Sequence, residues 1–65
     1  MTLLDIVSLV SPADRVTVSG DEILVDCFPA EKLLTDNYFQ EELADKEVRR
    51  IGIGLFNELV LFIAE

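Results

Sequence analysis

The stretch DNYFQEELADKE, residues 36–47, concentrates the reactive side chains of this chain, with five carboxylates, one lysine and an adjacent tyrosine and phenylalanine. Carboxylates at close spacing can bind a metal ion, move protons in catalysis or present negative charge to a basic partner. A calcium loop needs oxygen ligands at alternating positions around a central glycine, and residues 36–47 lack that pattern. Negative charge beside aromatic side chains is therefore the chemistry that this stretch offers.

Catalytic residues are sparse. The chain has no histidine, the side chain that most often moves protons at neutral pH, which excludes a Ser–His or Cys–His nucleophile. Cys27 lies in an apolar alternating run and is expected to be a small buried hydrophobe. Carboxylate-pair catalysis depends on a spatial separation and stays open, but 65 residues leave little room for a substrate pocket. We therefore expect no enzyme.

Metal and cofactor sites are not predicted either. The sequence contains no CxxC or HxxxH pair for zinc and no GxxxxGK phosphate loop. Gly52 and Gly54 are too few for a nucleotide-binding loop, and glycines in a strand more often mark a bulge or close packing. The expected cofactors and metals are none.

The elements that must position these residues begin with a short helix over residues 2–10. Thr2 and Asp5 resemble a capping box, and Leu3, Ile6 and following apolar residues recur at helical spacing. Residues 15–19 and 22–28 then alternate on either side of Gly20-Asp21, a pattern that predicts a β-hairpin. In the second run, one face is expected to hold Ile23, Val25 and Cys27.

A helical connector is predicted to follow. Pro29 suits the first position of a short helix, and residues 38–44 form a second helical piece in which Phe39 and Leu43 share a face. Phe39 is expected in the core. Tyr38 is expected to be exposed, because its neighbour takes the inward position.

Residues 47–54 and 58–64 predict a second hairpin. The alternative is one helix over residues 55–65, but Gly52 and Gly54 favour the hairpin, since a glycine costs a helix about 1 kcal/mol. The whole chain, residues 1–65, is then a single α+β domain. It has a roughly four-stranded antiparallel sheet, with the N-terminal helix on one face.

The net charge of −8 is distributed unevenly. Residues 14–26 carry −3 and residues 36–47 carry −4, so two stretches hold nearly all of the excess. Phosphates and anionic lipid surfaces would repel such a chain. We therefore expect neither direct nucleic-acid binding nor membrane binding, and the favoured partner is a basic protein surface.

DNA carries one phosphate charge per about 3.4 Å of helix axis on each strand, and i,i+4 neighbours on a helix lie about 6 Å apart. Carboxylates on short elements are therefore expected to approximate the charge spacing of DNA. The candidate phosphate mimics in the connector are Asp36, Glu41, Glu42, Asp45 and Glu47. A second patch is expected at Asp21, Glu22 and Asp26, with Tyr38 as an aromatic anchor. The competing interpretation is a solvated face that Arg49 and Arg50 partly neutralise by pairing with Glu41, Asp45 or Glu47.

The order of a leader helix, DRVTVSGDEILVDCF, a helical connector, ELADKEVRRIGIG and a closing strand resembles small acidic proteins encoded by bacterial phages and integrative elements. Neighbours of that group include anti-CRISPR proteins. The resemblance implies a non-enzymatic inhibitor that blocks a CRISPR effector nuclease with a DNA-like acidic surface.

Two function classes therefore stand after the sequence. The first is this inhibitor of a basic nucleic-acid-handling protein. The second is a structural or assembly module that acts by strand-edge pairing or homo-oligomerisation. The absence of a basic, cleavable leader and the lone cysteine predict a cytoplasmic location, and the resemblance to phage and integrative-element proteins implies that the cell is a bacterial host.

Overall fold

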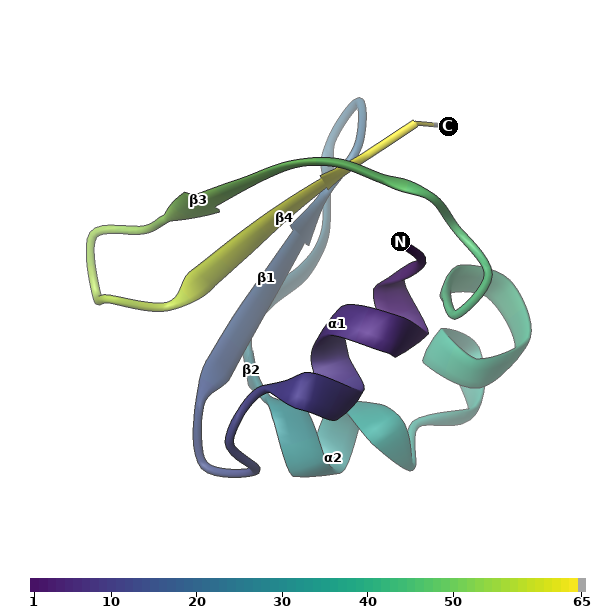
Figure 1. The fold of residues 1–65 in the computed structure, drawn as a ribbon, viewed down its shortest axis with the longest axis horizontal. Coiled ribbons are helices and arrows are strands. Elements are labelled where there is room, and N and C mark those ends of the chain that lie inside the picture. Colours follow the sequence, from purple (N-terminus) through teal and green to yellow (C-terminus); the bar gives the residue numbers. More distant parts are fainter. Residues whose placement is uncertain (65) are drawn as a thin grey trace.

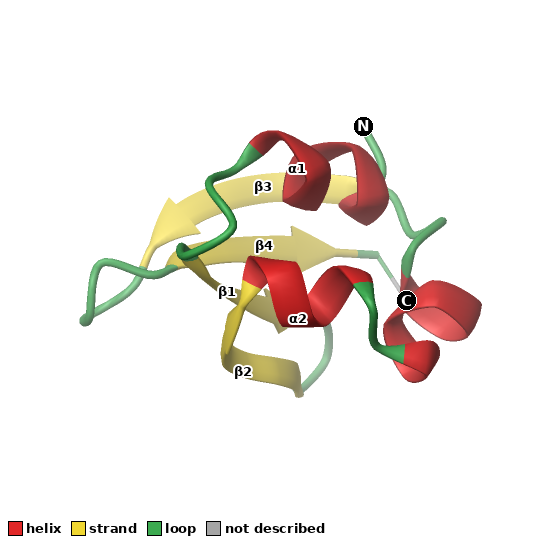
Figure 2. Ribbon diagram, turned by 90° about the horizontal axis from the view of Figure 1, so that it is seen from below, coloured by secondary structure: helices red, strands yellow, loops and turns green. Residues whose placement is uncertain are grey.

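The computed structural model describes residues 1–64. Its four strands are β1 (Arg15–Ser19), β2 (Ile23–Pro29), β3 (Val48–Ile53) and β4 (Leu59–Ile63), and they form one sheet in the order β2-β1-β4-β3. The helices α1 (Leu3–Leu9) and α2 (Ala30–Leu34) cover one face of this sheet (Figures 1 and 2). The connector continues into η1 (Phe39–Leu43), which packs beside them.

The expected α+β class, with a short N-terminal helix and a helical connector between strands, is confirmed. Strands β1 and β2 pair antiparallel, as do β3 and β4, so each predicted hairpin exists as a pair. The expectation of a purely antiparallel sheet is wrong, because β1 and β4 run parallel and make the sheet mixed. Alternating hydrophobicity fixes which residues of a strand face the core. It carries no information about the direction of the neighbouring strand.

The hydrophobic core lies between the sheet and the helices. The central strands contribute Val16, Val18 and Leu61, all fully buried. They meet apolar residues that recur at helical spacing on α1 and α2, namely Leu3, Ile6, Val7, Ala30 and Leu33. Within residues 1–64 no helix covers the other face of the sheet, so a one-sided core stabilises the chain.

Strand β4 shows that the alternative helix over residues 55–65 is wrong over its described part. The turn before it is closed by two hydrogen bonds, from the Gly54 N–H to the Glu58 carbonyl at 2.9 Å and from the Asn57 N–H to the Gly54 carbonyl at 3.1 Å. Asn57 has a φ of 62°, which asparagine tolerates better than most residues. A tight turn that ends in a left-handed residue is a common three-residue hairpin loop.

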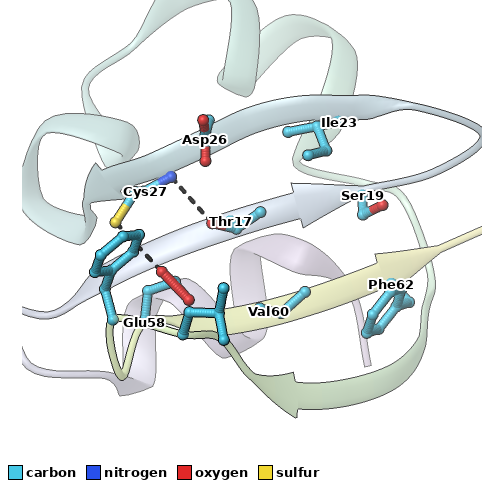
Figure 3. A pocket seen from close by; sticks show the side chains of 10 residues that line it. Thr17, Ser19, Ile23, Asp26, Cys27, Glu58, Val60 and Phe62 are labelled. Atoms are coloured by element: carbon cyan, nitrogen blue, oxygen red, sulfur yellow. Dashed lines mark hydrogen bonds between the residues drawn. The ribbon is translucent and has the colours of Figure 1, made fainter.

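Strand β2 departs from regular alternation at two bulges. Asp26 and Cys27 together oppose the single residue Thr17 of β1, and Leu24 is an extra residue further along the strand. Cys27 has a φ of 52°, and its N–H donates to the Thr17 hydroxyl at 3.0 Å instead of to a backbone carbonyl (Figure 3).

The bulges overturn the expectation that Ile23, Val25 and Cys27 share a face. Each bulge shifts the alternation by one residue. As a result Val25 packs against the core, while Ile23 and Cys27 line the open face of the sheet. Pro29, expected as the first helical residue, ends β2 and caps α2 instead.

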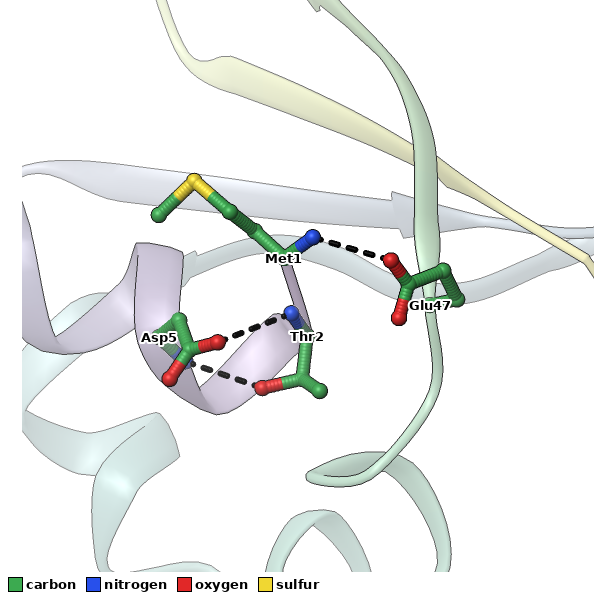
Figure 4. A network of polar contacts seen from close by, with 4 residues as sticks. All are labelled: Met1, Thr2, Asp5 and Glu47. Atoms are coloured by element: carbon green, nitrogen blue, oxygen red, sulfur yellow. Dashed lines mark hydrogen bonds and ion pairs between the residues drawn. The ribbon is translucent and has the colours of Figure 1, made fainter.

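The N-terminal segment is held against the start of β3. The Leu3 N–H donates to the Lys46 carbonyl and the Val48 N–H donates to the Met1 carbonyl, both at 2.9 Å. The terminal ammonium of Met1 forms an ion pair with Glu47 at 2.9 Å (Figure 4). These contacts fix where the connector ends and where α1 begins.

The predicted capping box at the start of α1 is confirmed. The Asp5 N–H donates to the Thr2 hydroxyl at 3.3 Å, and the Thr2 N–H donates to the Asp5 carboxylate at 3.1 Å (Figure 4). Two hydrogen bonds with Thr2 lower the pKa of Asp5. The larger effect comes from the Thr2 backbone N–H, and the next largest comes from the Thr2 side chain. The ionised carboxylate is thus the form that stabilises the helix.

We expect Asp5→Asn to lower the free energy of unfolding near neutral pH and to have little effect in acid. Because the folded-state pKa is lowered, the contribution of Asp5 is present above the unfolded pKa of about 3.9 and is lost as the pH falls through the folded value. Denaturant titrations at about pH 7 and about pH 2.5 measure this gap. Thr2→Ala should cost about 1 kcal/mol.

The exposed Asp14 provides the control for this pair of measurements. Asp14→Asn should leave the free energy of unfolding nearly unchanged at both pH values. An Asp5→Asn effect that is the same at both pH values would contradict the assignment of its stability to the ionised cap.

Candidate functional site

The acidic stretch expected to bind a partner is built on a π-helical turn. The Phe39 N–H donates to the Asp36 carboxylate at 2.9 Å, and the Gln40 N–H donates to the Asp36 carbonyl at 3.0 Å. The Ala44 N–H then donates to the Phe39 carbonyl at 2.8 Å, a bond five residues back in the chain. This wider turn allows Phe39, Leu43 and Ala44 to face the core together.

The same turn directs the polar side chains outward. Glu41 and Glu42 are exposed, and Tyr38 has 49% of its surface accessible whereas Phe39 has 0%. The predictions that Phe39 lies in the core and that Tyr38 is exposed are confirmed. Asp36 is only partly exposed, because its carboxylate also caps the turn.

The two acidic stretches meet at one shallow pocket of about 260 Å³. Asp26 reaches it from β2, and Asp36 and Tyr38 reach it from the connector. The floor is apolar and is formed by Leu24, Val25, Phe28 and Leu33. Three of the predicted site residues thus surround one hydrophobic depression. Asp26 comes from β2, and Asp36 and Tyr38 come from the connector, at least ten positions later in the sequence.

The remaining predicted residues lie outside this pocket. Glu41, Glu42 and Asp45 are exposed on and after η1, and Asp21 and Glu22 are exposed in the turn between β1 and β2. Glu47 is exposed next to the N-terminal segment, where it pairs with the terminal ammonium (Figure 4).

The predicted ion pairs of Arg49 and Arg50 with Glu41, Asp45 or Glu47, all of which lie within the described residues 1–64, are not formed in the structure. The guanidinium of Arg50 lies over the ring of Phe62, 4.4 Å from its centroid, a cation–π contact on the open face of the sheet. The cation that meets Glu47 is the terminal ammonium of Met1.

A second hollow, about 450 Å³ in volume, lies on the open face of the sheet. Figure 3 shows Cys27 and Glu58 pointing toward each other across it, with the thiol 3.5 Å from the Glu58 carboxylate. Glu58 is buried, with 7% of its surface accessible. Its Oε1 atom lies 1.2 Å from where a Cβ on Gly54 would stand, so this carboxylate position requires the glycine.

Glu58 is not predicted from the sequence as a site residue. The available signal is Gly54, four residues earlier, since strand glycines mark close approach. Cys27, expected to be a buried hydrophobe, is instead half-buried and turned toward Glu58 by the bulge. A bulge leaves no local sequence signal here, because Cys27 is neither glycine nor asparagine.

The chemistry available at Cys27 is limited. Burial, the hydrogen bond to Glu58 and the charge of that carboxylate, in this order, raise the pKa of the Cys27 thiol. The protonated thiol is a poor nucleophile.

The described residues also bear on metal and membrane sites. Among residues 1–64 no three His, Cys, Asp or Glu side chains converge in a way that would hold a metal ion. Within the same residues, no helix has the length and apolar character needed to cross a membrane.

Comparison of the chain with protein-family models, with curated proteins and with solved structures finds no match.

We expect Glu58→Gln to lower the pKa of Cys27 while leaving it above the ordinary thiol value. The substitution removes the carboxylate charge that disfavours the thiolate, but the burial of the sulfur remains. The pH dependence of thiol alkylation measures the pKa directly. Glu31→Gln, which alters an exposed acid on α2, is the matched control, and an unchanged pKa in Glu58→Gln would refute the coupling.

Proposed function

We propose that this protein is a non-enzymatic inhibitor that binds a basic nucleic-acid-handling protein through an acidic surface. The observation that carries the proposal is the meeting of Asp26, Asp36 and Tyr38 around one apolar hollow. The exposed acids of η1 and of the β1–β2 turn extend the negative charge beyond it.

Each part of this surface has a separate role in binding. Exposed ion pairs contribute only about 0–1 kcal/mol each, so the acids mainly steer a basic partner and set its orientation. Tyr38 supplies an exposed aromatic anchor. The apolar floor at Leu24 and Phe28 accepts the aliphatic stem of a lysine or arginine, whose charged end then meets Asp26 or Asp36.

Most concretely, the target is a CRISPR effector nuclease in the cytoplasm of a bacterial host. Such an enzyme holds nucleic acid in a positively charged channel and reads a short duplex motif with arginines. The resemblance to small acidic proteins of phages and integrative elements supports this choice of target. Occupation of the channel by the acidic surface would exclude DNA.

The first test is affinity capture from a bacterial lysate, with partners identified by mass spectrometry. The expected result is a basic nucleic-acid-binding protein that is released both by duplex DNA and by raising the salt from about 0.05 M to about 0.5 M. Recovery of a partner that neither DNA nor salt displaces would reject the acidic-surface proposal.

We expect the double variant Glu41→Lys/Glu42→Lys to weaken binding to that partner at least about tenfold, equivalent to about 1.4 kcal/mol. Both residues are exposed on η1, so the fold should persist. The double variant Asp14→Lys/Glu31→Lys changes net charge equally but lies outside the proposed surface. Equal loss in both double variants would assign the effect to net charge, and equal retention would remove the η1 acids from the interface.

We expect Tyr38→Ala to weaken the same complex by about 2 kcal/mol, or roughly thirtyfold, if its ring is the central anchor. Isothermal titration calorimetry gives the affinity. Phe56→Ala is the matched control, since Phe56 is an exposed aromatic in the β3–β4 turn. A Tyr38→Ala variant that binds as tightly as Phe56→Ala would show that the anchor lies elsewhere.

A further inference from the structure

The hollow on the open face of the sheet, called here the open-face hollow, contains a carboxylate with too few hydrogen-bond donors. Glu58 has only 7% of its surface accessible. Within residues 1–64 the one donor to its carboxylate is the Cys27 thiol, 3.5 Å from Oε2 (Figure 3). A thiol is a weak donor, whereas an ionised carboxylate can accept about four hydrogen bonds. Burial of a charge is costly unless the charge is paired and hydrogen-bonded, so Glu58 has acceptor capacity that the chain leaves unused.

The cations on this side of the sheet are engaged elsewhere. The Arg15 guanidinium donates to the Cys27 carbonyl at 2.8 Å, and the Arg50 guanidinium lies over the ring of Phe62. Neither arginine lines the open-face hollow, and within the described residues neither forms an ion pair with Glu58. The Glu58 carboxylate therefore faces the hollow without a counter-charge from residues 1–64.

The position of this carboxylate is fixed by the turn between β3 and β4. The Gly54 N–H donates to the Glu58 carbonyl at 2.9 Å, and the Glu58 side chain folds back over Gly54, where a Cβ would overlap Oε1. Gly54 does not have a positive φ, so its backbone conformation does not require glycine. The space that the carboxylate occupies does require it. The charge is thus held in place before any ligand arrives, which lowers the cost of binding.

The rest of the open-face hollow has the character of a small-molecule site. Its volume of about 450 Å³ falls within the range of about 300–1,000 Å³ that is usual for such sites. Apolar side chains from β2, β4 and the β3–β4 turn form most of its walls, namely Ile23, Leu55, Phe56, Val60 and Phe62. Ser19 adds a hydroxyl, and Asp26 adds a second carboxylate. Within the described part of the chain, no lysine or arginine lines it.

This lining selects the chemistry of the ligand. Two carboxylates without a basic neighbour in the lining attract a cation, and a primary ammonium brings three donors to the unused acceptor sites of Glu58. The apolar walls favour a hydrocarbon body, and the rings of Phe56 and Phe62 favour an aromatic one. An anion would be repelled, and a neutral apolar compound would leave the buried carboxylate unpaired.

We propose that the open-face hollow binds a small primary amine with an aromatic body. Its ammonium contacts Glu58, and its ring packs among the side chains of Phe56 and Phe62. The site is independent of the proposed inhibitor function, because Glu58 does not belong to the acidic surface. Asp26 is the one residue that lines both this hollow and the pocket beside Tyr38.

Three ligands with the same ring and a different head group test the site. Phenethylamine carries the ammonium, phenethyl alcohol replaces it with a hydroxyl, and hydrocinnamate replaces it with a carboxylate. Each is titrated into isotope-labelled protein near pH 7, and the amide chemical shifts are followed by NMR. Concentrations up to about 10 mM nearly saturate a site with a Kd of about 1 mM, a reasonable affinity for so small a ligand.

The expected result is a set of shifts at the amides of Thr17, Cys27, Gly54 and Val60, which lie in or beside the open-face hollow. The amine should bind at least about tenfold more tightly than the alcohol. Hydrocinnamate should not bind.

Two variants test the role of the carboxylate. Glu58→Gln should remove the preference for the amine over the alcohol. Gly54→Ala should weaken amine binding at least about tenfold, because the added methyl takes the place of the carboxylate. It leaves the net charge unchanged, so it separates the position of the charge from its presence.

Each variant has a matched control. Glu31→Gln removes an exposed acid on α2, and Gly52→Ala places a Cβ at an ordinary contact distance of 3.5 Å from Phe62. Both controls should bind the amine as the parent does. Amide spectra without ligand show whether each variant keeps the fold.

Several results would overturn the proposal. Equal binding of the amine and the alcohol would reject the role of Glu58. Failure of all three ligands to bind at about 10 mM, well above the expected Kd, would leave the hollow to solvent. Shifts confined to Leu24, Leu33 and Tyr38 would place the amine in the acidic pocket instead.

A further arm distinguishes a free amine from a lysine side chain of a partner protein, which carries the same ammonium. Nα-acetyl-lysine amide should bind more weakly than phenethylamine, because it lacks the ring. Equal binding of the two would reject an aromatic amine and assign the hollow to such a lysine. Loss of the captured nuclease with amine binding intact would instead reject only the inhibitor function.

Discussion

The one-sided core is the constraint on which the rest of this structure depends. The central strands β1 and β4 bury their apolar side chains against helices of seven and five residues, lengths that are unstable in isolation. A domain of this size buries only about 60% of its unfolded surface. Its helices therefore depend mainly on their packing against the sheet and additionally on the hydrogen bonds at their ends. The Thr2–Asp5 box serves α1, and the Asp36 carboxylate serves the turn that leads into η1.

The same constraint explains why the polar groups lie where they do. Three side chains from the π-helical turn, Phe39, Leu43 and Ala44, must enter the core from a stretch that is otherwise acidic. An ordinary α-helical turn aligns only two of them well, and the wider turn aligns all three. The acids are then displaced to the outer side, where water solvates them. The charged surface of the connector is thus a direct result of how its apolar residues pack.

Local features of the sequence predicted most of the elements. The capping box, the alternating runs around Gly20-Asp21 and the spacing of Phe39 and Leu43 are each readable within a few residues, because they reflect short-range backbone and side-chain geometry. The mixed sheet and the bulges at Leu24 and Cys27 were not predictable in this way. They arise from pairing between strands whose contacts the local pattern does not encode. For the same reason Asp26, Asp36 and Tyr38 could each be predicted as site residues from the sequence, but their proximity could not. Only the packing of the connector against β2 brings them to one hollow.

The parallel pairing of β1 with β4 has a consequence for the order in which the chain folds. Val16 pairs with Leu59, more than forty positions later, so the centre of the sheet is its least local part. Closing so long a loop before its contacts form is slow. During synthesis on the ribosome, the β1–β2 hairpin, α1 and the connector all emerge before β4. Until that strand is released, β1 has a neighbouring strand on the β2 side only, and its other edge has no hydrogen-bonding partner.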